Sequence, residues 1–423
     1  MTSTSADPAP SSDEGGTGAD GRSPIRRALA IPRFRRLFVA QTISRWGDTF
    51  NAVALVILVY RLTGSGVKVA GTVAFEIVPV VALGFVAGAV VDRYPRVRVM
   101  VVADLARALV AIALAIGQHH LWTVYAAAFG LSAFSAFFNP AAASVVPLLV
   151  GDDDVVGANS AIWSAAVISQ IVLAPLAGAL VAFAGAGPAF LINATSFVVS
   201  AGLLVGLRLP AVPRQIGRQR FDDVTEGLRV IRASRLLSTL AGVQGLAALS
   251  AGATSALLVV LAERHLHLGA ARFGWLLAAI GVGAGFGPLL LQKVVGDVRR
   301  PAFLFGPYLL RGAVDLTLAA TGSFAVAAGA LGVYGLGTST GNVTYQSVLQ
   351  RAVPDRVRGR VFASYDVVWQ SGRLVSIGAG GILADRLGIV AVYILGGALL
   401  IAAGLLGILR AGPPSTSPAP GPM

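Results

Sequence analysis

Twelve long apolar segments constrain the fold of this chain more than any other feature. The sequence is 55% hydrophobic and 13% charged, and the apolar residues gather in runs separated by short polar turns. A run of about 20 apolar residues crosses the roughly 30 Å hydrocarbon layer of a membrane as a helix, which satisfies its own backbone hydrogen bonds. We therefore predict an all-α membrane protein. Its expected spans are 37–60, 68–91, 97–117, 121–149, 156–184, 187–209, 236–261, 270–292, 300–320, 322–349, 359–384 and 389–410.

The two halves of the chain repeat each other at an offset of 203 residues. The matching pairs are Gly71 and Gly274, Gly84 and Gly287, Arg96 and Arg299, Asn139 and Asn342, and Gly178 and Gly381. Parallel repeats of six spans are typical of transporters whose halves rock around a central site. We expect a disordered tail at 1–32, a six-helix bundle at 33–209, a linker at 210–235, a second bundle at 236–410 and a disordered tail at 411–423.

Basic residues lie mostly on one side of this predicted topology. Of the 33 Lys and Arg residues, 24 fall in the two tails and in the loops after even-numbered spans, and five in the opposite loops. This bias predicts a multi-pass protein of the inner or plasma membrane with both termini in the cytoplasm. Attraction to anionic lipid accounts for the net charge of +13, and no nucleic-acid partner is expected.

The motifs of enzymes and cofactor sites are missing from the sequence. There is no Gly-rich phosphate loop, no His-Glu-x-x-His and no Gly-x-Ser-x-Gly. Cysteine is absent and there are only four histidines, so we expect no metal and no cofactor. We predict that the protein is not an enzyme, and that an ion gradient supplies its energy.

The segment "GAVVDRYPRVRVM" places charge between two apolar spans. Its residues Gly88, Asp92, Arg93, Arg96 and Arg98 form the predicted gating loop. Together with Gly84, Gly88 offers a small surface for close helix approach, and Asp92 would face the positive N-terminal end of the span that begins near 359. The alternative is a basic loop that only anchors the topology.

Several segments resemble the major facilitator superfamily. "GAVVDRYPRVRV" resembles its signature loop between helices 2 and 3, and "VLAPLAG" resembles the motif of its exporters. "FRRLFVAQTISRWGDTFNAVAL", "RLTGSG" and "PDRVRGRVFAS" resemble the drug:proton antiporter branch that contains macrolide-efflux and enterobactin-exporter proteins. This resemblance implies two pseudo-symmetric six-helix bundles and an exporting transporter. Span 4 contains no Arg, so the proton relay of many relatives is not carried over.

Charged residues within the spans are candidates for proton coupling, because ionisable groups in a membrane are costly and mark pathways or relays. Glu76 is the first candidate, since no basic residue lies within a turn or two of it in the sequence and burial favours its protonated form. Alternatively, Glu76 hydrogen-bonds across helices or reaches water. Asp48 and Arg45 lie on one face of span 1 and have either a coupling or a structural role.

Two further charge pairs fit structural compensation better than transport. Asp104 and Arg107 lie three residues apart in span 3, and Arg311 and Asp315 lie four apart in span 9. Both spacings place the members of a pair on one face of a helix, where they neutralise each other.

Polar residues scattered over five spans are candidates to line a substrate cavity. They are Gln41, Asn51, Trp163, Gln170, Gln244, Asn342, Tyr345, Gln346 and Trp369. A mostly apolar cavity with a few hydrogen-bonding groups suits an amphipathic organic molecule.

We therefore expect a monomeric secondary transporter that exports a hydrophobic or amphipathic small molecule, such as a drug or natural product, by proton antiport and alternating access. The alternatives are an exporter of a siderophore or other metabolite, an importer of the same fold, and a transporter-like receptor or scaffold that transports nothing.

Overall fold

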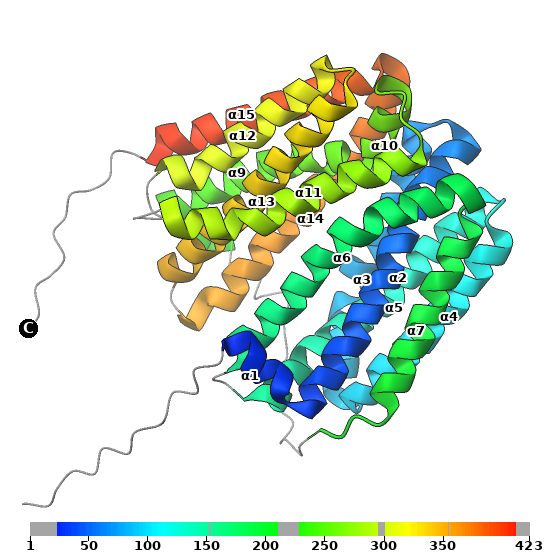
Figure 1. Ribbon diagram of the computed structural model, residues 1–423. Helices are drawn as coiled ribbons and strands as arrows, with labels where there is room; N and C mark the ends of the chain where they lie inside the picture. Colours follow the sequence, from blue (N-terminus) through cyan, green and yellow to red (C-terminus); the bar gives the residue numbers. More distant parts are fainter. Residues whose placement is uncertain (1–22, 152–153, 210–227, 295–300, 354, 412–423) are drawn as a thin grey trace, which may run out of the picture.

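The computed structural model describes residues 23–151, 154–209, 228–294, 301–353 and 355–411. Over these residues the chain is helical and contains no strand, which confirms the predicted all-α fold (Figure 1). Most of the linker predicted at 210–235 and most of the C-terminal tail lie outside the described residues.

Twelve helices of 19 or more residues in the described part of the chain correspond one to one with the predicted spans. They are α2 (Pro32–Thr63), α3 (Gly66–Arg93), α4 (Arg96–Gly117), α5 (Leu121–Val150), α6 (Val155–Ala184), α7 (Gly187–Val205), α9 (Arg235–Ala256), α11 (Ala270–Val294), α12 (Pro301–Ala320), α13 (Phe324–Ala352), α14 (Asp355–Leu387) and α15 (Ile389–Ala411). Nine of these described helices are apolar enough to cross a membrane by length and composition. The other three, α2, α13 and α14, carry more charged or hydroxyl-bearing side chains.

The tail predicted at 1–32 is wrong in its last part, because Pro24–Ala30 form a short helix, α1. Proline in the first turn is compatible with a helix, since its missing N–H has no partner there in any case. The helix packs against the start of α6, where Arg27 pairs with Asp154 at 3.0 Å and the backbone of Pro24 contacts Gly157. These tertiary contacts order a segment whose composition alone favours disorder.

Short turns make sequential helices antiparallel. Gly64 ends α2 with a left-handed φ of 60°, and its N–H donates to the carbonyl oxygen of Tyr60. The Ser65 hydroxyl then accepts from the Lys68 N–H and caps α3. Because the chain passes through the molecule twelve times in alternating directions, α2 begins and α15 ends on the same side of the molecule. We call this the terminal side, and the opposite side the far side.

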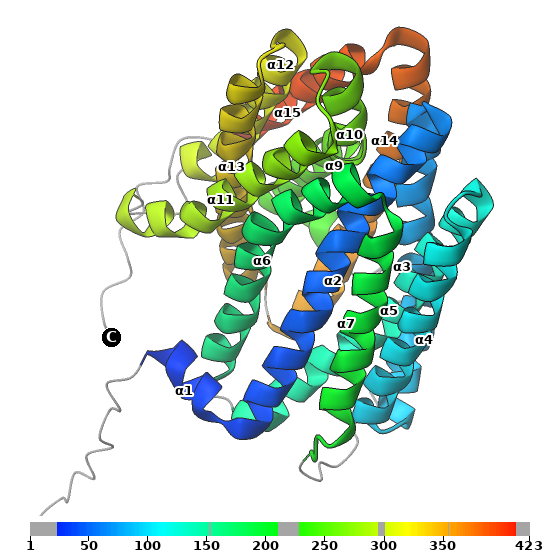
Figure 2. The same ribbon diagram turned by 45° about the vertical axis from the view of Figure 1, so that its right-hand side comes forward.

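The helices form two bundles, α2–α7 and α9–α15, which meet mainly where α6 packs on α11 and α3 packs on α14 (Figures 1 and 2). At the far side one buried apolar cluster includes residues of both bundles, among them Phe190 and Tyr393. At the terminal side each bundle has its own cluster, around Met100 in the first and Phe305 in the second. The bundles are therefore joined at the far side and separate at the terminal side.

Glycine allows the close contacts that join the bundles. A Cβ atom on Gly274 of α11 would overlap the carbonyl oxygen of Ala174 in α6. A Cβ atom on Gly381 of α14 would come within 2.9 Å of Val67 Cα and Ala70 Cβ in α3. Backbones that approach this closely leave no room for a larger side chain, so these positions fix the closed far side.

The predicted close approach at Gly84 and Gly88 is not present. A Cβ atom on either residue would meet no other atom within 4 Å. Both residues lie toward the terminal end of α3, where the two bundles diverge. The close contacts between α3 and α14 are made instead by glycines at the far side, Gly66 of α3 and Gly381 of α14.

We predict that Gly274→Val prevents closure of the far side, because the valine side chain would overlap the backbone of α6 at Ala174, which cannot move aside as a flexible side chain can. Overpacking of this kind costs about 1–3 kcal/mol, so the thermal unfolding midpoint should fall. The matched control is Gly329→Val in α13, where an added Cβ meets nothing within 4 Å. Equal unfolding midpoints for the two variants would contradict this account of the contact.

Candidate functional site

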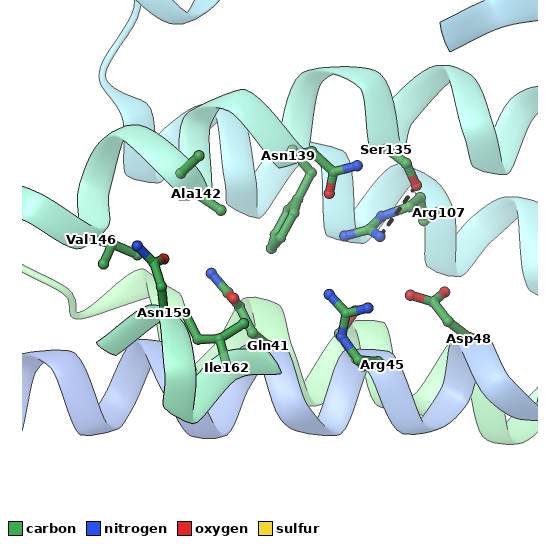
Figure 3. Close-up of a pocket in the computed structure, with 13 residues that line it drawn as sticks. Gln41, Arg45, Asp48, Arg107, Ser135, Asn139, Ala142, Val146, Asn159 and Ile162 are labelled. Carbon is green, nitrogen blue, oxygen red and sulfur yellow. Dashed lines mark hydrogen bonds between the residues drawn. The ribbon is translucent and has the colours of Figure 1, made fainter. Parts of the chain in front are cut away.

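The first bundle contains a polar cavity of about 340 Å³. Helices α2, α4, α5 and α6 contribute its walls, and side chains from these helices point into one shared space (Figure 3). It reaches from the middle of the bundle toward the terminal ends of α5 and α6. The lining residues are Gln41, Ser44, Arg45, Asp48, Arg107, Ser135, Phe138, Asn139, Ala142, Ala143, Val146, Asn159 and Ile162.

Helical periodicity explains which residues reach this cavity. Gln41, Arg45 and Asp48 recur at intervals of three and four residues, so they share one face of α2. Ser135, Asn139 and the apolar residues that follow at similar intervals line the opposite wall from α5. Eight of the thirteen lining residues are polar or charged, so the expectation of a mostly apolar cavity is wrong here.

Arg107 is held rigidly at one end of the cavity. It forms the predicted ion pair with Asp104, which also accepts a 2.7 Å hydrogen bond from the Ser200 hydroxyl. The guanidinium lies 4.5 Å from the ring centre of Phe138 and 4.3 Å from that of Phe197. A buried charge fixed by a carboxylate and two aromatic faces is already compensated.

Arg45 and Asp48 are compensated much less. Both side chains point into the cavity (Figure 3), and within the described residues neither forms an ion pair within 4.0 Å or a side-chain hydrogen bond. Asp48 lies within electrostatic reach of Arg107 and, more weakly, of Arg45. One guanidinium and one carboxylate therefore face the cavity with free hydrogen-bonding capacity.

Glu76 is half-buried in α3, and its charge environment comes from other helices. Arg373 of α14 acts on it across the boundary between the bundles, and Asp48 of α2 acts on it within its own bundle. The sequence places no basic residue within a turn or two of Glu76, and the fold adds the electrostatic influence of an arginine from another helix. The carboxylate connects the charged cavity to the second bundle.

Arg311 and Asp315 are both buried, but the predicted ion pair between them is absent from the described residues. The Arg311 guanidinium instead donates a 2.9 Å hydrogen bond to the Tyr334 hydroxyl and lies 4.8 Å from the centre of that ring. Asp315 keeps one buried carboxylate oxygen without a hydrogen bond. The partner of Arg311 is therefore Tyr334 on α13, which the spacing of residues within α12 cannot predict.

Of the polar residues predicted to line a cavity, Gln41 does so. Gln244 accepts a 2.9 Å hydrogen bond from Tyr308, and Gln170 packs near Gly281 where α6 meets α11. Asn51 and Tyr345 are buried, and Trp369 packs against the apolar cluster of the second bundle. Trp163, Asn342 and Gln346 are exposed.

Four polar lining residues were not among the predicted ones. They are Ser44, Ser135, Asn139 and Asn159. Asn139 carries a signal, because the 203-residue repeat matches it to Asn342. Serines in membrane helices commonly bond their own backbone, as Ser135 does to the Leu131 carbonyl at 2.8 Å, so their positions reveal little.

At the far side, Asp385 at the end of α14 caps the beginning of α3. Its carboxylate accepts hydrogen bonds from the Ser65 hydroxyl at 2.6 Å, the Gly66 N–H at 2.7 Å and the Val67 N–H at 3.1 Å. A carboxylate at a helix N-terminus satisfies free N–H groups and interacts favourably with the helix dipole. The two bundles are joined here by charge as well as by apolar packing.

Arg264, which follows α9, completes this far-side polar cluster. It contacts Asp385 at 3.4 Å, donates to the Tyr60 hydroxyl at 3.1 Å and donates to the Gly64 carbonyl oxygen. Partial burial raises the pKa of Asp385, but the hydrogen bonds from Ser65 and the α3 backbone and the charge of Arg264 hold it below its ordinary value. The cluster therefore weakens only as the pH falls through that lowered pKa.

The predicted gating loop lies at the opposite end of α3 and is open. Asp92, Arg93 and Arg98 are exposed, and Asp92 makes no ion pair or hydrogen bond within the described residues. Arg96 donates a long hydrogen bond of 3.4 Å to the Ser144 carbonyl of α5. The side chains at the start of α14 lie largely outside the described residues, so the expected contact of Asp92 with that helix end stays a prediction.

The family model described as transmembrane secretion effector matches residues 23–419. The chain belongs to this family of major facilitator transporters. It is 27% identical over 391 residues to the MFS-type transporter YfiS of Bacillus subtilis, covering 88% of this chain and 92% of that protein. It is 22% identical to macrolide efflux protein A of Streptococcus pyogenes, covering 87% of this chain and 93% of that protein. It is 24% identical to the enterobactin exporter EntS of Escherichia coli, covering 84% and 85%.

Solved structures share the fold at low sequence identity. A bacterial homologue of the iron transporter ferroportin, in an inward-facing state, superposes with a TM-score of 0.71 at 18% identity, covering 93% of this chain and all of that one. The nucleoside transporter NupG superposes with a TM-score of 0.73 at 11% identity, covering 90% and 99%. The two-bundle arrangement is thus that of major facilitator transporters.

We predict that Asp385→Ala opens the far side, because the first turn of α3 loses its acceptor. The chain has no cysteine, so Ala70→Cys provides a single reporter at a buried far-side position. Its labelling by a membrane-impermeant maleimide should accelerate several-fold in the Asp385→Ala background. The control is Asp92→Ala, which removes an exposed carboxylate from the other end of α3, and similar labelling rates in both backgrounds would refute the role of Asp385.

Proposed function

We propose that this transporter exports an amphipathic small molecule in exchange for protons by alternating access. One observation carries the proposal: a polar cavity with free charged groups lies in a molecule that is closed at the far side and divergent at the terminal side. The excess of Lys and Arg at the terminal side supports a cytoplasmic location for that side and for both termini. The cavity then faces the compartment from which an exporter takes its substrate.

Export is also supported by two of the relatives. Macrolide efflux protein A and the enterobactin exporter EntS carry organic molecules out of cells according to their names. An apolar strip of the cavity, formed by Phe138, Val146 and Ile162, suits the hydrophobic part of such a molecule. Its amides and charged groups suit a polar part.

Coupling to protons is proposed to involve Glu76 and Asp48. A carboxylate in a span is costly unless it is paired or protonated, and Glu76 is influenced by Arg373 of the other bundle. A proton on Glu76 cancels its attraction to Arg373, so proton binding changes the free energy of holding α3 against α14. This gives the proton a differential effect on two arrangements of the bundles, which is what coupling requires.

A transport assay in inverted membrane vesicles tests the proposal. With an imposed pH gradient, acidic inside, we expect accumulation of amphipathic organic compounds and a matching release of protons. The transporter should act as a monomer, so activity should persist at one copy per vesicle. The absence of any substrate-induced proton flux across a broad compound panel would refute proton-coupled export and favour a receptor or scaffold.

We predict that Glu76→Gln abolishes proton-coupled export while the protein stays folded. The amide keeps the size of the side chain and cannot exchange a proton, so substrate should still bind but not be accumulated against a gradient. The control is Asp154→Asn, which alters a carboxylate at the terminal end of α6, outside the cavity. Wild-type accumulation by Glu76→Gln at several pH values would exclude Glu76 as the proton carrier.

A further inference from the structure

We propose that the transported molecule has a zwitterionic head group, whose carboxylate binds Arg45 and whose amine binds Asp48. This inference rests on the proposed function, because it assumes that the cavity of the first bundle is the substrate site. It narrows the proposed substrate class from amphipathic molecules in general to those that carry a positive and a negative charge close together.

Arg45 and Asp48 are the charged groups of the cavity that have no ion-pair partner within the described residues. Arg107 is occupied by Asp104, by Ser135 and by two aromatic rings, so it offers mainly a fixed background charge, although its buried Nε has no hydrogen-bond partner within the described residues. Arg45 and Asp48 lie three residues apart on α2, about 4.5 Å along the helix axis at 1.5 Å per residue. They line the cavity together, and no ion pair within 4.0 Å joins them in the described residues. A guanidinium binds a carboxylate with two parallel hydrogen bonds, and a carboxylate accepts from an ammonium.

Charge balance favours a ligand with both charges over a ligand with one. The two arginines of the cavity, Arg45 and Arg107, are matched by Asp48 and by Asp104 behind Arg107. Arg45 and Asp48 are both exposed to the open cavity, and a purely anionic or cationic ligand would pair with only one of them and leave the other without an opposite charge. A zwitterion gives each free group an opposite partner and leaves the net charge unchanged.

The remaining lining residues suit the rest of such a molecule. Gln41, Asn139 and Asn159 present amides that donate and accept hydrogen bonds beside Arg45 (Figure 3). Phe138 and Ile162 provide an apolar surface for a hydrophobic side group. A cavity of about 340 Å³ accommodates a compact organic molecule and excludes a large macrocycle from full enclosure.

This arrangement also gives a direct route to antiport. A proton on Asp48 removes the negative charge that attracts the ligand's ammonium, so proton and substrate compete for the same carboxylate. The charged groups that act on Asp48 are Arg45 on its own helix, Arg107 and Asp104 on α4, and Glu76 on α3. Competition at Asp48 couples substrate release to proton binding, while Glu76 links protonation to the arrangement of the two bundles.

The test uses purified protein in lipid nanodiscs and four forms of one amphipathic probe. The probes are p-benzoylphenylalanine, its methyl ester, its N-acetyl derivative and the N-acetyl methyl ester, and their binding is measured by equilibrium dialysis. We expect the zwitterion to bind at least tenfold more tightly than any capped form. Arg45→Gln should remove the advantage of the free carboxylate only, and Asp48→Asn the advantage of the free amine only.

Controls separate folding, binding and transport. Arg272→Gln changes an exposed arginine at the start of α11 and should keep the preference for the zwitterion. Equal binding of all four forms, or no binding of any form to a protein with an unchanged unfolding midpoint, would overturn the zwitterion proposal. The same probes in pH-loaded vesicles report on the proposed function separately. Proton-driven transport of the doubly capped form would overturn the zwitterion proposal alone, whereas charge-selective binding without proton-driven transport would overturn proton-coupled export alone.

Discussion

The contact between α3 and α14 at the far side is the constraint on which the rest of the structure depends. Glycine lets the two backbones approach closely, and the Asp385 carboxylate accepts hydrogen bonds from backbone N–H groups in the first turn of α3. Because both helices are long and rigid, fixing them at one end lets the bundles diverge at the other. The same antiparallel pair has a second carboxylate at its opposite end, Asp92, which is exposed and has no partner within the described residues. The far end of this helix pair is held by charge.

The charged groups around the cavity divide into a buried pair and two exposed free groups. Asp104 and Arg107 satisfy each other with help from Ser200, so they stabilise the first bundle without needing a ligand. Arg45 and Asp48 lie in the same cavity and remain free to bind a ligand. Uncompensated groups gain more from a ligand or a proton than a pair that is already satisfied, and this difference supports the proposed binding site. The fold supports a chemically selective site close to a rigid one.

Glu76 illustrates how electrostatics connects the two bundles. The charge of Arg373, nearly three hundred residues away in sequence, acts on it because α3 packs on α14. In the proposed mechanism, movement of one bundle against the other changes this interaction and links the protonation of Glu76 to the arrangement of the bundles.

The sequence by itself determined the twelve long helices, because apolar length and short turns are local properties of the chain. The family followed from the resemblance of its motifs. The sequence also revealed the Asp104–Arg107 pair, since a spacing of three residues places both on one helix face. Tertiary structure alone decided that Arg311 bonds to Tyr334 rather than Asp315, that the charge of Arg373 acts on Glu76, and that Asp385 caps α3. These partners lie on other helices, and nothing in local spacing specifies which faces of two rigid rods will meet. The sequence did not predict the polar character of the cavity either, because its lining comes from four helices whose facing sides are set only by the tertiary structure.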